Sequence, residues 1–186
     1  MKDIIFIRHG ATKGNLERRY VGATDEPLCS QGIAETEKIK NDMPKTDHII
    51  VSPLLRTVQT AQILFPNGKY EVNKDLRETN FGIFENKNAR DLENDGQYRA
   101  WVNSGCKEKI PGGEDTAEFK KRCCRGFLNA VSRVPDGETA AFVIHGGVIM
   151  AIMEQFCIPQ RSFYDYHIKN GEYIRCRFNG ETLTVY

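Results

Sequence analysis

Two of the four histidines in this chain stand at the ends of strand-like apolar segments and directly precede glycine. His9 comes after the apolar run 4–7 and Arg8, and His145 comes after the apolar run 140–144. In an open α/β sheet, reactive groups collect beyond the carboxyl ends of the strands, so these two rings could face one another across one site. A neutral imidazole can act as a nucleophile, and a second one can hold an anion or transfer a proton. Taken singly, each histidine is equally well explained as a buried or capping residue.

An arginine and a carboxyl group occupy comparable positions between the two histidines. Arg56 lies in the segment 52–61, which follows a short apolar run, and Glu78 lies in the segment 76–82. Arginine binds phosphate oxygens through paired N–H groups and keeps its charge, and helix N-termini add backbone donors for an anion. His9 could then attack phosphorus while a protonated Glu78 protonates the leaving oxygen. Together these residues predict a phosphate monoester site, although Arg56 or Glu78 alone would be ordinary surface residues.

The periodicity of the remaining sequence predicts the elements that would bring these side chains together. Short apolar runs predict strands, and apolar residues at helical spacing predict helices between them. The predicted strands are 4–7, 49–51, 70–73 and 140–144, and the predicted helices are 30–41, 53–65, 116–133 and 146–157. Ser30 is predicted to cap the first helix, and Pro53 to occupy the first position of the second. The buried side of the first helix would be formed by Ile33, Ala34 and Ile39.

The end of the chain has the pattern of a β-hairpin. Asn179-Gly180 separates 173–178 from 181–186, and this dipeptide favours a type I′ turn. Strands that alternate with helices predict a layered α/β/α sandwich, with a mostly parallel central sheet, helices on both faces and this hairpin. A length of 186 residues fits a single domain over 1–186. Within it, a partly helical insertion at about 79–114 is predicted to cover the site.

Composition and charge argue against several other classes of protein. The formal net charge is +1 and 27% of the residues are charged, so nothing indicates a nucleic acid or a membrane surface as a partner. No apolar stretch has the length of a transmembrane helix or of the apolar region of a signal peptide, and we expect a cytoplasmic protein. The six cysteines include no C-x-x-C pair, so we expect reduced, mostly buried thiols rather than disulfides or a zinc site.

The polar segments, in their order along the chain, resemble the motifs of the histidine phosphatase superfamily, also called the phosphoglycerate mutase-like group. R-H-G-x-T-x-x-N matches 8–15, and S-P-L-x-R-x-x-Q-T-A matches 52–61. L-x-E-x-x-F-G matches 76–82, and the H-G-G turn matches 145–147. Two further matches are G-x-T-D-x-P-L at 22–28 and P-G-G-E at 111–114. The resemblance therefore spans nearly the whole chain, and the ordered set is far more specific than any one motif.

This resemblance implies a role for each matching residue. His9 would accept the phosphoryl group, and Glu78 would act as acid and base. The phosphate ligands would be Arg8, Arg56, His145, Asn15 and the backbone N–H of Gly146. The reaction would pass through a phosphohistidine that water then hydrolyses. No metal or other cofactor is implied, and the sequence contains no aspartate cluster or His/Cys spacing that suggests a metal site.

Within the superfamily, the chain looks most like the α-ribazole phosphatases of cobalamin synthesis. The similarity lies in residues 81–101 and 171–173. Three positions depart from the usual pattern. Phe84 stands where Trp is common, Asn86 where Gly usually follows the glutamate, and Cys29 where Thr is frequent. These departures concern substrate specificity more than the phosphate site.

The implied function is a metal-independent phosphomonoesterase whose partner is a small phosphorylated metabolite, with α-ribazole 5′-phosphate or a similar ester as substrate. A phosphoglycerate mutase and a broad-specificity sugar or acid phosphatase are alternatives, as is a non-catalytic phospho-ligand-binding protein. The complete set of site residues argues against the last of these. Monomer and homodimer both stay open. Four aromatic residues of the insertion could lie over a nucleoside-like base or could simply form its core. They are Phe81, Phe84, Tyr98 and Trp101.

Overall fold

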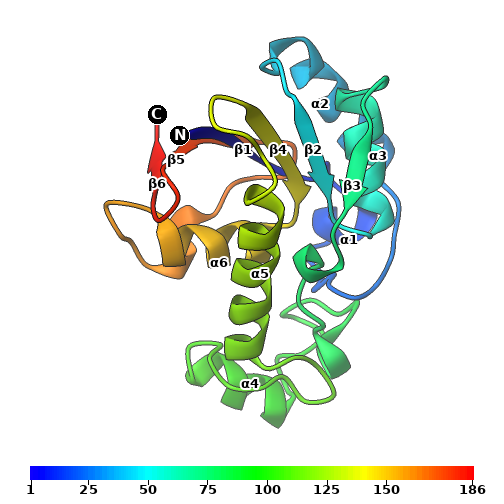
Figure 1. The fold of residues 1–186 in the computed structure, drawn as a ribbon. Helices are drawn as coiled ribbons and strands as arrows, with labels where there is room; N and C mark the ends of the chain where they lie inside the picture. The colour runs from blue at the N-terminus through cyan, green and yellow to red at the C-terminus, as the bar shows by residue number, and fades with distance from the viewer.

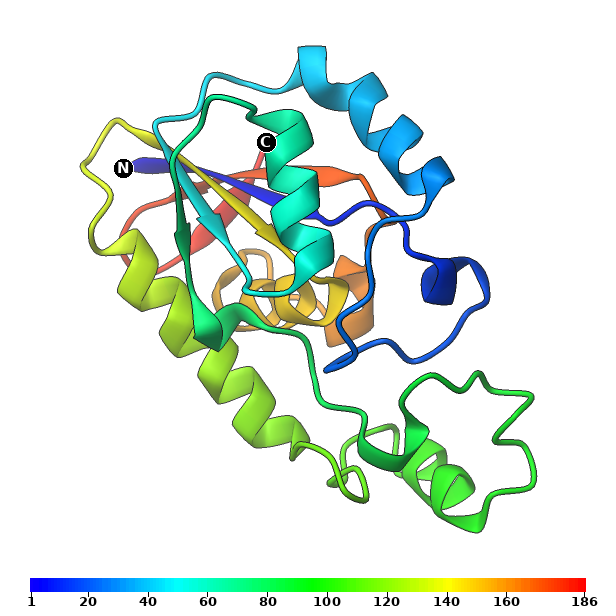
Figure 2. The same cartoon turned by 90° about the vertical axis from the view of Figure 1, so that its right-hand side faces the viewer.

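A six-stranded mixed sheet with helices on both faces forms the centre of the molecule (Figures 1 and 2). The computed structural model describes residues 1–186. The strands are β1 (Lys2–Arg8), β2 (His48–Val51), β3 (Tyr70–Val72), β4 (Thr139–Ile144), β5 (Tyr173–Phe178) and β6 (Leu183–Val185). Their order is β3-β2-β4-β1-β5-β6, in which β1 to β4 run parallel and the last two strands pair antiparallel. The α/β sandwich predicted from the sequence is confirmed.

Helices of the two layers come from different parts of the chain. The α-helices are α1 (Lys13–Leu16), α2 (Ser30–Ile39), α3 (Leu55–Leu64), α4 (Gly96–Asn103), α5 (Thr116–Val131) and α6 (Gly146–Phe156). The short 3-10 helices are η1 (Lys40–Asp42), η2 (Lys74–Leu76), η3 (Gly82–Phe84) and η4 (Phe163–Tyr166). Helix α3, with α2 beside it, covers one face of the sheet, and α5 and α6 cover the other (Figures 1 and 2). None of these helices combines the length and the apolar character that crossing a bilayer requires.

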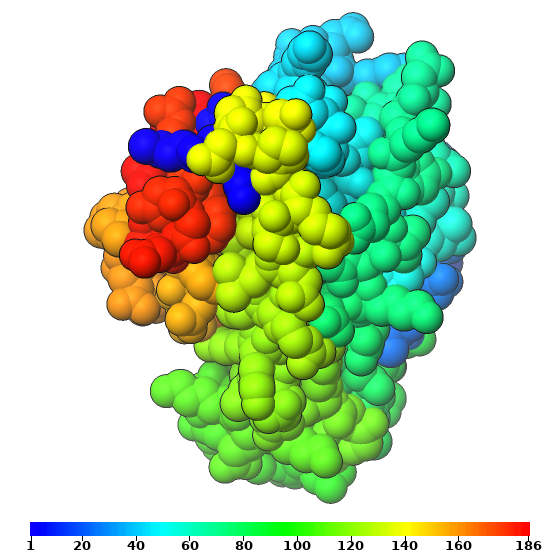
Figure 3. All heavy atoms as spheres, in the orientation of Figure 1, coloured from blue at the N-terminus to red at the C-terminus, as the bar shows by residue number.

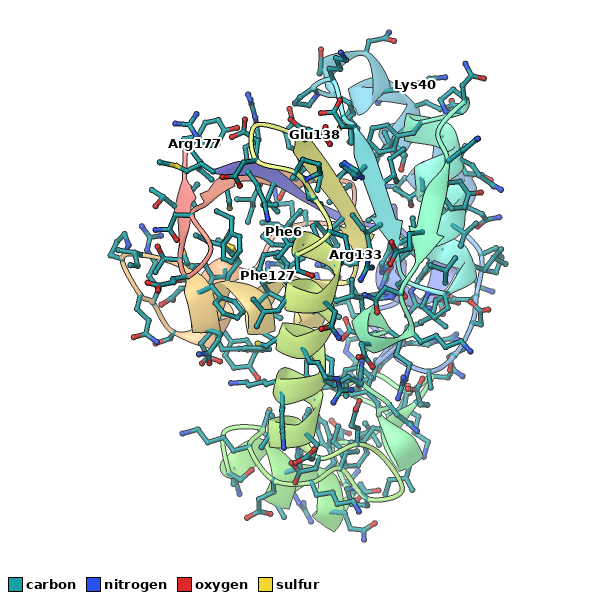
Figure 4. The ribbon with its side chains drawn as sticks, viewed as in Figure 1. Phe6, Lys40, Phe127, Arg133, Glu138 and Arg177 are labelled. Carbon is teal, nitrogen blue, oxygen red and sulfur yellow. The ribbon has the colours of Figure 1, made fainter.

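Each face of the sheet packs against its own core. On the α5–α6 side, Phe6 points toward Phe127 of α5 (Figure 4), with 5.6 Å between their ring centroids, and Phe142 of β4 completes this group. On the α3 side, Ile5 of β1 packs in a separate cluster that includes Leu64. Because successive residues of a strand face opposite sides, a strand covered on both faces must be apolar at every position. This explains the uninterrupted apolar runs in the sequence.

Two helix starts differ from the sequence predictions. Helix α2 is capped by Cys29 rather than by Ser30, because the Cys29 Sγ accepts a hydrogen bond from the Gly32 N–H at 3.4 Å. Pro53 lies before α3 instead of in its first position, because Leu54 is the N-cap. In both cases the helix exists as predicted, and its start differs from the prediction by no more than helix boundaries ordinarily vary.

The buried side of α2 also differs from the prediction. Gly32 and Thr36 are buried, whereas Ile33 and Ala34 are exposed and Ile39 is half-buried. A methyl group added at Gly32 would lie 2.0 Å from a backbone oxygen of the loop that follows β1. Small residues therefore let α2 approach this loop closely, and the apolar side chains on either side remain near the surface.

The hairpin of β5 and β6 is present, but its turn is not of type I′. That turn requires a positive φ at both central residues, and here only Gly180 has one, at 107°. The Asn179 Oδ1 instead accepts hydrogen bonds from the N–H groups of Glu181 and Thr182 at 2.9 and 2.7 Å. The asparagine side chain thus closes a longer loop. The hairpin lies beside β1, with Phe178 of β5 opposite Lys2, so the red atoms of the hairpin adjoin the blue atoms of β1 in Figure 3.

The insertion has a small core of its own. Phe84, Leu92, Tyr98, Trp101 and Ile110 are buried together, and Phe81 lies half-exposed beside them. The insertion as a whole forms the green mass at the lower end of the molecule in Figure 3, beyond the start of α5. Most of the insertion's aromatic residues are therefore core residues, and only Phe81 is placed to offer an accessible ring.

The six cysteines are all free thiols. Cys123, Cys157 and Cys176 are buried, and Cys29, Cys106 and Cys124 are partly exposed. Burial raises the pKa of Cys176 to about 12, so this thiol stays protonated. The buried cysteines therefore act as packing residues of the core.

Candidate active site

The two histidines meet beyond the carboxyl ends of β1 and β4. These strands are parallel neighbours in which Arg8 pairs with Ile144, so the residues that follow them come side by side. The ring centroids of His9 and His145 lie 5.1 Å apart, edge to face. The His9 N–H donates to the Ile144 carbonyl at 3.0 Å, which fixes the backbone at this point. Both rings are buried, with 4% and 0% of their surface exposed.

The surroundings of His9 determine which ring nitrogen carries the proton. Its Nδ1 lies 2.7 Å from the Gly10 carbonyl oxygen, and a carbonyl can only accept. Nδ1 is therefore the donor, and Nε2 of the neutral ring carries the lone pair. Burial and the positive charges of Arg56 and Arg8 hold the pKa of His9 well below 6.5, so the ring is neutral near pH 7. His9 thus presents an unprotonated Nε2, as a nitrogen nucleophile requires.

The ring of His145 is held at Nε2, whereas that of His9 is held at Nδ1. Its Nε2 lies 2.7 Å from the Ser52 Oγ, and its Nδ1 is buried without a hydrogen-bond partner. Burial, together with the charges of Arg56, His9 and Arg8, holds the pKa of His145 well below 6.5. The Ser52 hydroxyl has no other acceptor and donates to Nε2, so the proton of the neutral ring resides on Nδ1, and this N–H can donate to an anion.

Arg8 ends β1 with its guanidinium against the start of α6. Its Nη1 donates to the Ile168 carbonyl at 2.7 Å and lies 3.1 Å from the His167 Nε2. A Cβ added at Gly146 would lie 3.2 Å from the Arg8 Nε, so glycine lets the guanidinium lie close to the helix N-terminus. Burial lowers the pKa of Arg8, and the negative charges of Glu78 and Glu172 oppose this effect.

Arg56 projects from α3 and is fully buried. Its Nη1 donates to the Thr24 carbonyl at 2.8 Å, and its Nη2 donates to the Gly22 and Val21 carbonyls at 2.9 and 3.4 Å. The Arg56 Nε has no partner. Burial lowers the pKa of Arg56, and the charge of Glu78 is the largest effect in the opposite direction. A buried guanidinium without a carboxylate on its Nε–H is suited to binding an anionic ligand.

Glu78 is the carboxyl group of the site. Its Oε1 accepts from the Thr79 N–H at 2.9 Å and its Oε2 from the Gly147 N–H at 3.0 Å, at the start of α6. Burial raises the pKa of Glu78 above 4.5, although these hydrogen bonds and the charges of Arg56 and Arg8 oppose the shift. Glu78 therefore keeps its proton to a higher pH than a surface glutamate, as a general acid must.

A partly buried ion pair holds the segment that leads to Glu78. Glu114 accepts hydrogen bonds from the Nε and Nη2 of Arg122 at 2.8 and 2.7 Å. The Arg122 Nη1 donates to the carbonyls of Asp75 and Arg77 at 2.7 and 2.9 Å. The glutamate of the P-G-G-E segment thus supports the backbone before Glu78 through an arginine of α5.

Asn15, a predicted phosphate ligand, is linked to the His9 backbone through Asn170, and its side-chain oxygen already accepts two hydrogen bonds. The Oδ1 accepts from the Thr12 N–H and from the Asn170 Nδ2, each at 3.1 Å. The Asn170 Nδ2 also lies 3.1 Å from the His9 carbonyl oxygen. Only the amide nitrogen of Asn15 therefore remains to donate to a phosphate.

Sequence reasoning assigned no role to three residues that support the site. Ser52 contacts His145, His167 contacts Arg8, and Asn170 links Asn15 to the backbone of His9. Ser52 lies within a recognised motif and could have been found from it. His167 and Asn170 lie in a C-terminal segment without a distinctive pattern, and only the fold brings them to the site.

Unpartnered donors mark the place that an anion would occupy. Three of the five buried side-chain polar atoms without a hydrogen-bond partner belong to the site. They are the Nε of Arg8, the Nε of Arg56 and the Nδ1 of His145. Buried donors are nearly always paired in proteins, so this concentration beside the unprotonated Nε2 of His9 indicates a binding site for an oxyanion. No group of three or more His, Cys, Asp or Glu side chains is arranged to hold a metal ion.

We expect the rings of His9 and His145 to stay neutral where an ordinary histidine titrates, around pH 6.5. NMR signals of the ring C–H groups, assigned with His9→Gln and His145→Gln, should show no inflection there in the folded protein and should show one in the denatured protein. The denatured state then binds more protons at lower pH, so the free energy of unfolding should fall as the pH drops through this value. An ordinary inflection of either ring in the folded protein would contradict the neutral state.

Comparisons with known proteins agree with this geometry. Residues 4–186 match the family model described as the histidine phosphatase superfamily (branch 1). The chain is 35% identical, over 152 residues, to a Cronobacter sakazakii protein named "Probable phosphoglycerate mutase GpmB", covering 78% of this chain and 70% of that protein.

The similar solved structures include proteins named as phosphatases and a protein named as a mutase. The α-ribazole phosphatase of Shigella flexneri superposes with a TM-score of 0.86 at 25% identity, covering 99% of this chain and 94% of that one. A phosphoglycerate mutase of Thermus thermophilus superposes with a TM-score of 0.76 at 25% identity, covering 97% and 95% of the two chains.

Proposed function

The chain belongs to the histidine phosphatase superfamily, and we propose that it hydrolyses a small phosphate monoester through a phosphohistidine formed on His9. One observation carries this proposal. The unprotonated Nε2 of His9 lies among buried, unpartnered donors of Arg8, Arg56 and His145. A nucleophile beside preorganised positive charge is the arrangement that phosphoryl transfer needs, because catalysis of this reaction consists mainly of positioning and charge stabilisation.

In the first step the lone pair of the His9 Nε2 forms a bond to phosphorus while the bond from phosphorus to the ester oxygen breaks. Arg8, Arg56 and His145 donate to the non-bridging oxygens, whose negative charge they stabilise. Glu78, whose pKa is raised by burial, gives its proton to the leaving oxygen. The products are an alcohol and a phosphohistidine.

In the second step water replaces the alcohol. The Glu78 carboxylate takes a proton from the water, whose oxygen bonds to phosphorus as the bond to the His9 Nε2 breaks. Inorganic phosphate leaves, and His9 and Glu78 return to their starting states. The hydrogen bonds from Thr79 and Gly147 hold Glu78 in one place for both transfers.

We expect phosphate release from p-nitrophenyl phosphate to continue at an unchanged rate after exhaustive chelation with EDTA. The reason is that two guanidinium groups and a histidine already supply the donors that a metal would otherwise provide. Release of p-nitrophenol also separates an enzyme from a phospho-ligand-binding protein. Loss of activity on chelation, with recovery on adding Mg²⁺ or Zn²⁺, would contradict metal independence, and no release under any condition would contradict the enzyme.

We propose α-ribazole 5′-phosphate, or a similar nucleoside-like ester, as the substrate. The sequence of the insertion and the likeness to the Shigella flexneri enzyme support this choice. The burial of Phe84, Tyr98 and Trp101 leaves only Phe81 as a ring of the insertion that could contact an aromatic base.

We therefore expect kcat/KM for α-ribazole 5′-phosphate to exceed that for 3-phosphoglycerate by more than about tenfold. The ratio of these two constants is the measure of specificity. The named mutase relatives make 3-phosphoglycerate the most informative competitor, and its isomerisation should be assayed along with its hydrolysis. Parity, or a preference for 3-phosphoglycerate, would overturn the substrate assignment and leave the phosphohistidine chemistry standing.

A further inference from the structure

The carboxylate of Glu85 lies at the centre of a hydrogen-bond cluster that the proposed reaction does not use. Its Oε1 accepts from the N–H groups of Ala23 and Phe81 at 2.8 and 2.9 Å. Its Oε2 accepts from the Thr24 Oγ1 at 2.7 Å and from the N–H groups of Gly22 and Thr24 at 3.2 and 3.3 Å. Hydrogen bonds to an ionised acceptor are roughly twice as strong as neutral ones, so this carboxylate holds the turn 22–24 firmly.

The carbonyl groups of the same turn bind Arg56. Gly22 and Thr24 each direct an N–H to Glu85 and a carbonyl oxygen to the Arg56 guanidinium. The Val21 carbonyl supplies the remaining contact, at 3.4 Å. All the acceptors that hold the two terminal nitrogens of Arg56 therefore come from this one loop, and the peptide units between Glu85 and Arg56 connect the two side chains.

The loop also packs closely against the segment that follows Glu78. A Cβ at Gly22 would lie 1.7 Å from the Thr79 carbonyl oxygen, so the loop lies directly against the residue after Glu78. Asn86 adds a hydrogen bond from its Nδ2 to the Thr24 Oγ1 at 3.1 Å. Asn86 also has a positive φ of 61°, a conformation that asparagine tolerates better than most residues and that glycine adopts freely.

We propose that Glu85 is a positioning residue for Arg56: through the peptide units of residues 22–24 it fixes the orientation in which the guanidinium meets the phosphate. The inference rests on the proposed function for the role of Arg56, and on the hydrogen bonds alone for the coupling between the two side chains. Removing the carboxylate would leave the Arg56 charge near the site but no longer hold it in one orientation. Transition-state binding would then suffer more than substrate binding, so kcat should fall more than KM rises.

A double-mutant cycle tests this coupling. Glu85→Ala is expected to lower kcat/KM for p-nitrophenyl phosphate about 100-fold in the wild-type background, the loss typical of a displaced catalytic group. In the Arg56→Ala background the same change should cost less than about threefold, because the residue through which Glu85 acts is already gone. Equal losses in the two backgrounds, or no loss in the wild type, would overturn the proposal.

Glu85→Gln keeps the test valid should the alanine variant fail to fold. Each carboxylate oxygen accepts at least two hydrogen bonds, so the glutamine NH₂ must face donors whichever way the amide lies. Asp95→Ala is the matched control, because Asp95 also accepts two backbone N–H groups within the insertion, from Gln97 and Tyr98 at 2.8 and 3.1 Å. It should lower the melting temperature and leave kcat/KM unchanged. If Asp95→Ala lowered kcat/KM as much as Glu85→Ala does, the loss would reflect a general destabilisation of the insertion, and the proposal would be overturned.

A readout without turnover separates this proposal from the proposed function. The Arg56 Nε–H is buried, so its signal in ¹⁵N NMR spectra should exchange slowly with solvent in the wild type and in Asp95→Ala. We expect exchange to become more than about tenfold faster in Glu85→Gln. An unchanged signal there would overturn the positioning role whatever the kinetics. Faster exchange in a protein that hydrolyses no phosphate ester would support the positioning role and contradict the proposed function.

Discussion

The variant His9→Ala is expected to lose turnover by at least about 10⁴-fold while keeping the wild-type fold, because no other side chain of the site can take over the nucleophile's role. The Nε2 of His145 is hydrogen-bonded to Ser52, and its Nδ1 is placed as a donor. The His9 ring makes its single hydrogen bond to the carbonyl of the next residue, so its removal breaks no hydrogen bond between distant segments. Stopped assays of p-nitrophenol release and thermal unfolding followed by circular dichroism measure the two effects separately.

His48→Ala provides the matched control for this variant. His48 lies at the start of β2, at the other end of the sheet, where it pairs with Glu138. Its removal should leave kcat unchanged. Turnover by His9→Ala within about tenfold of the wild type would show that His9 is not the nucleophile.

Arg56→Ala is expected to reduce kcat/KM roughly 100-fold, which corresponds to a loss of about 3 kcal/mol of transition-state stabilisation. The loss of one preorganised donor has an effect of this size in other sites that bind developing negative charge. The variant also leaves the carbonyls of Val21, Gly22 and Thr24 without their donors, so the melting temperature should fall. Kinetics measured well below that temperature isolate the catalytic loss.

Arg56→Lys separates charge from geometry. Lysine keeps the positive charge but lacks the planar set of N–H donors of a guanidinium. The activity of Arg56→Lys should therefore lie between those of the wild type and Arg56→Ala. Wild-type kinetics in Arg56→Ala, accompanied only by a lower melting temperature, would make Arg56 a structural residue.

The sequence predicts the centre of the site because that part depends on local patterns. The apolar runs of β1 and β4 identify two strands covered on both faces, and the polar residues directly after them must lie at the sheet edge. Parallel pairing of these strands is enough to bring His9 and His145 together. Prediction of the central pair therefore needed only the strand ends and the fold class.

The supports of the site depend on contacts that no local pattern records. Arg56 bonds to carbonyls 32 to 35 residues before it in the chain, and Asn170 contacts the carbonyl oxygen of His9 from 161 residues away. A backbone carbonyl is present at every residue, so its use as an acceptor for Arg56 leaves no trace in residue type. The same reason explains why Glu85, whose partners are mostly backbone N–H groups, carries no motif-level signal for its contacts.

Surface helices and turns were predicted less well because packing overrides their patterns. Ile33 and Ala34 have the spacing of a buried face, yet the close approach of Gly32 to the loop after β1 turns a different side of α2 inward. Asn179-Gly180 has the composition of a type I′ turn, yet the Asn179 side chain bonds to two later N–H groups and closes a longer loop. In each case one specific contact outweighs a general preference.

The most direct test of the account is to trap phosphate on His9. Glu78→Gln should accumulate the phosphoenzyme from p-nitrophenyl phosphate, because p-nitrophenolate leaves without a proton whereas the attack of water needs the Glu78 carboxylate as base. After rapid quenching in alkali, peptide mapping by mass spectrometry should find a near-stoichiometric, acid-labile phosphate on His9, and none in the variant that also carries His9→Ala. Phosphate on another residue, or equal labelling without His9, would contradict the phosphohistidine mechanism.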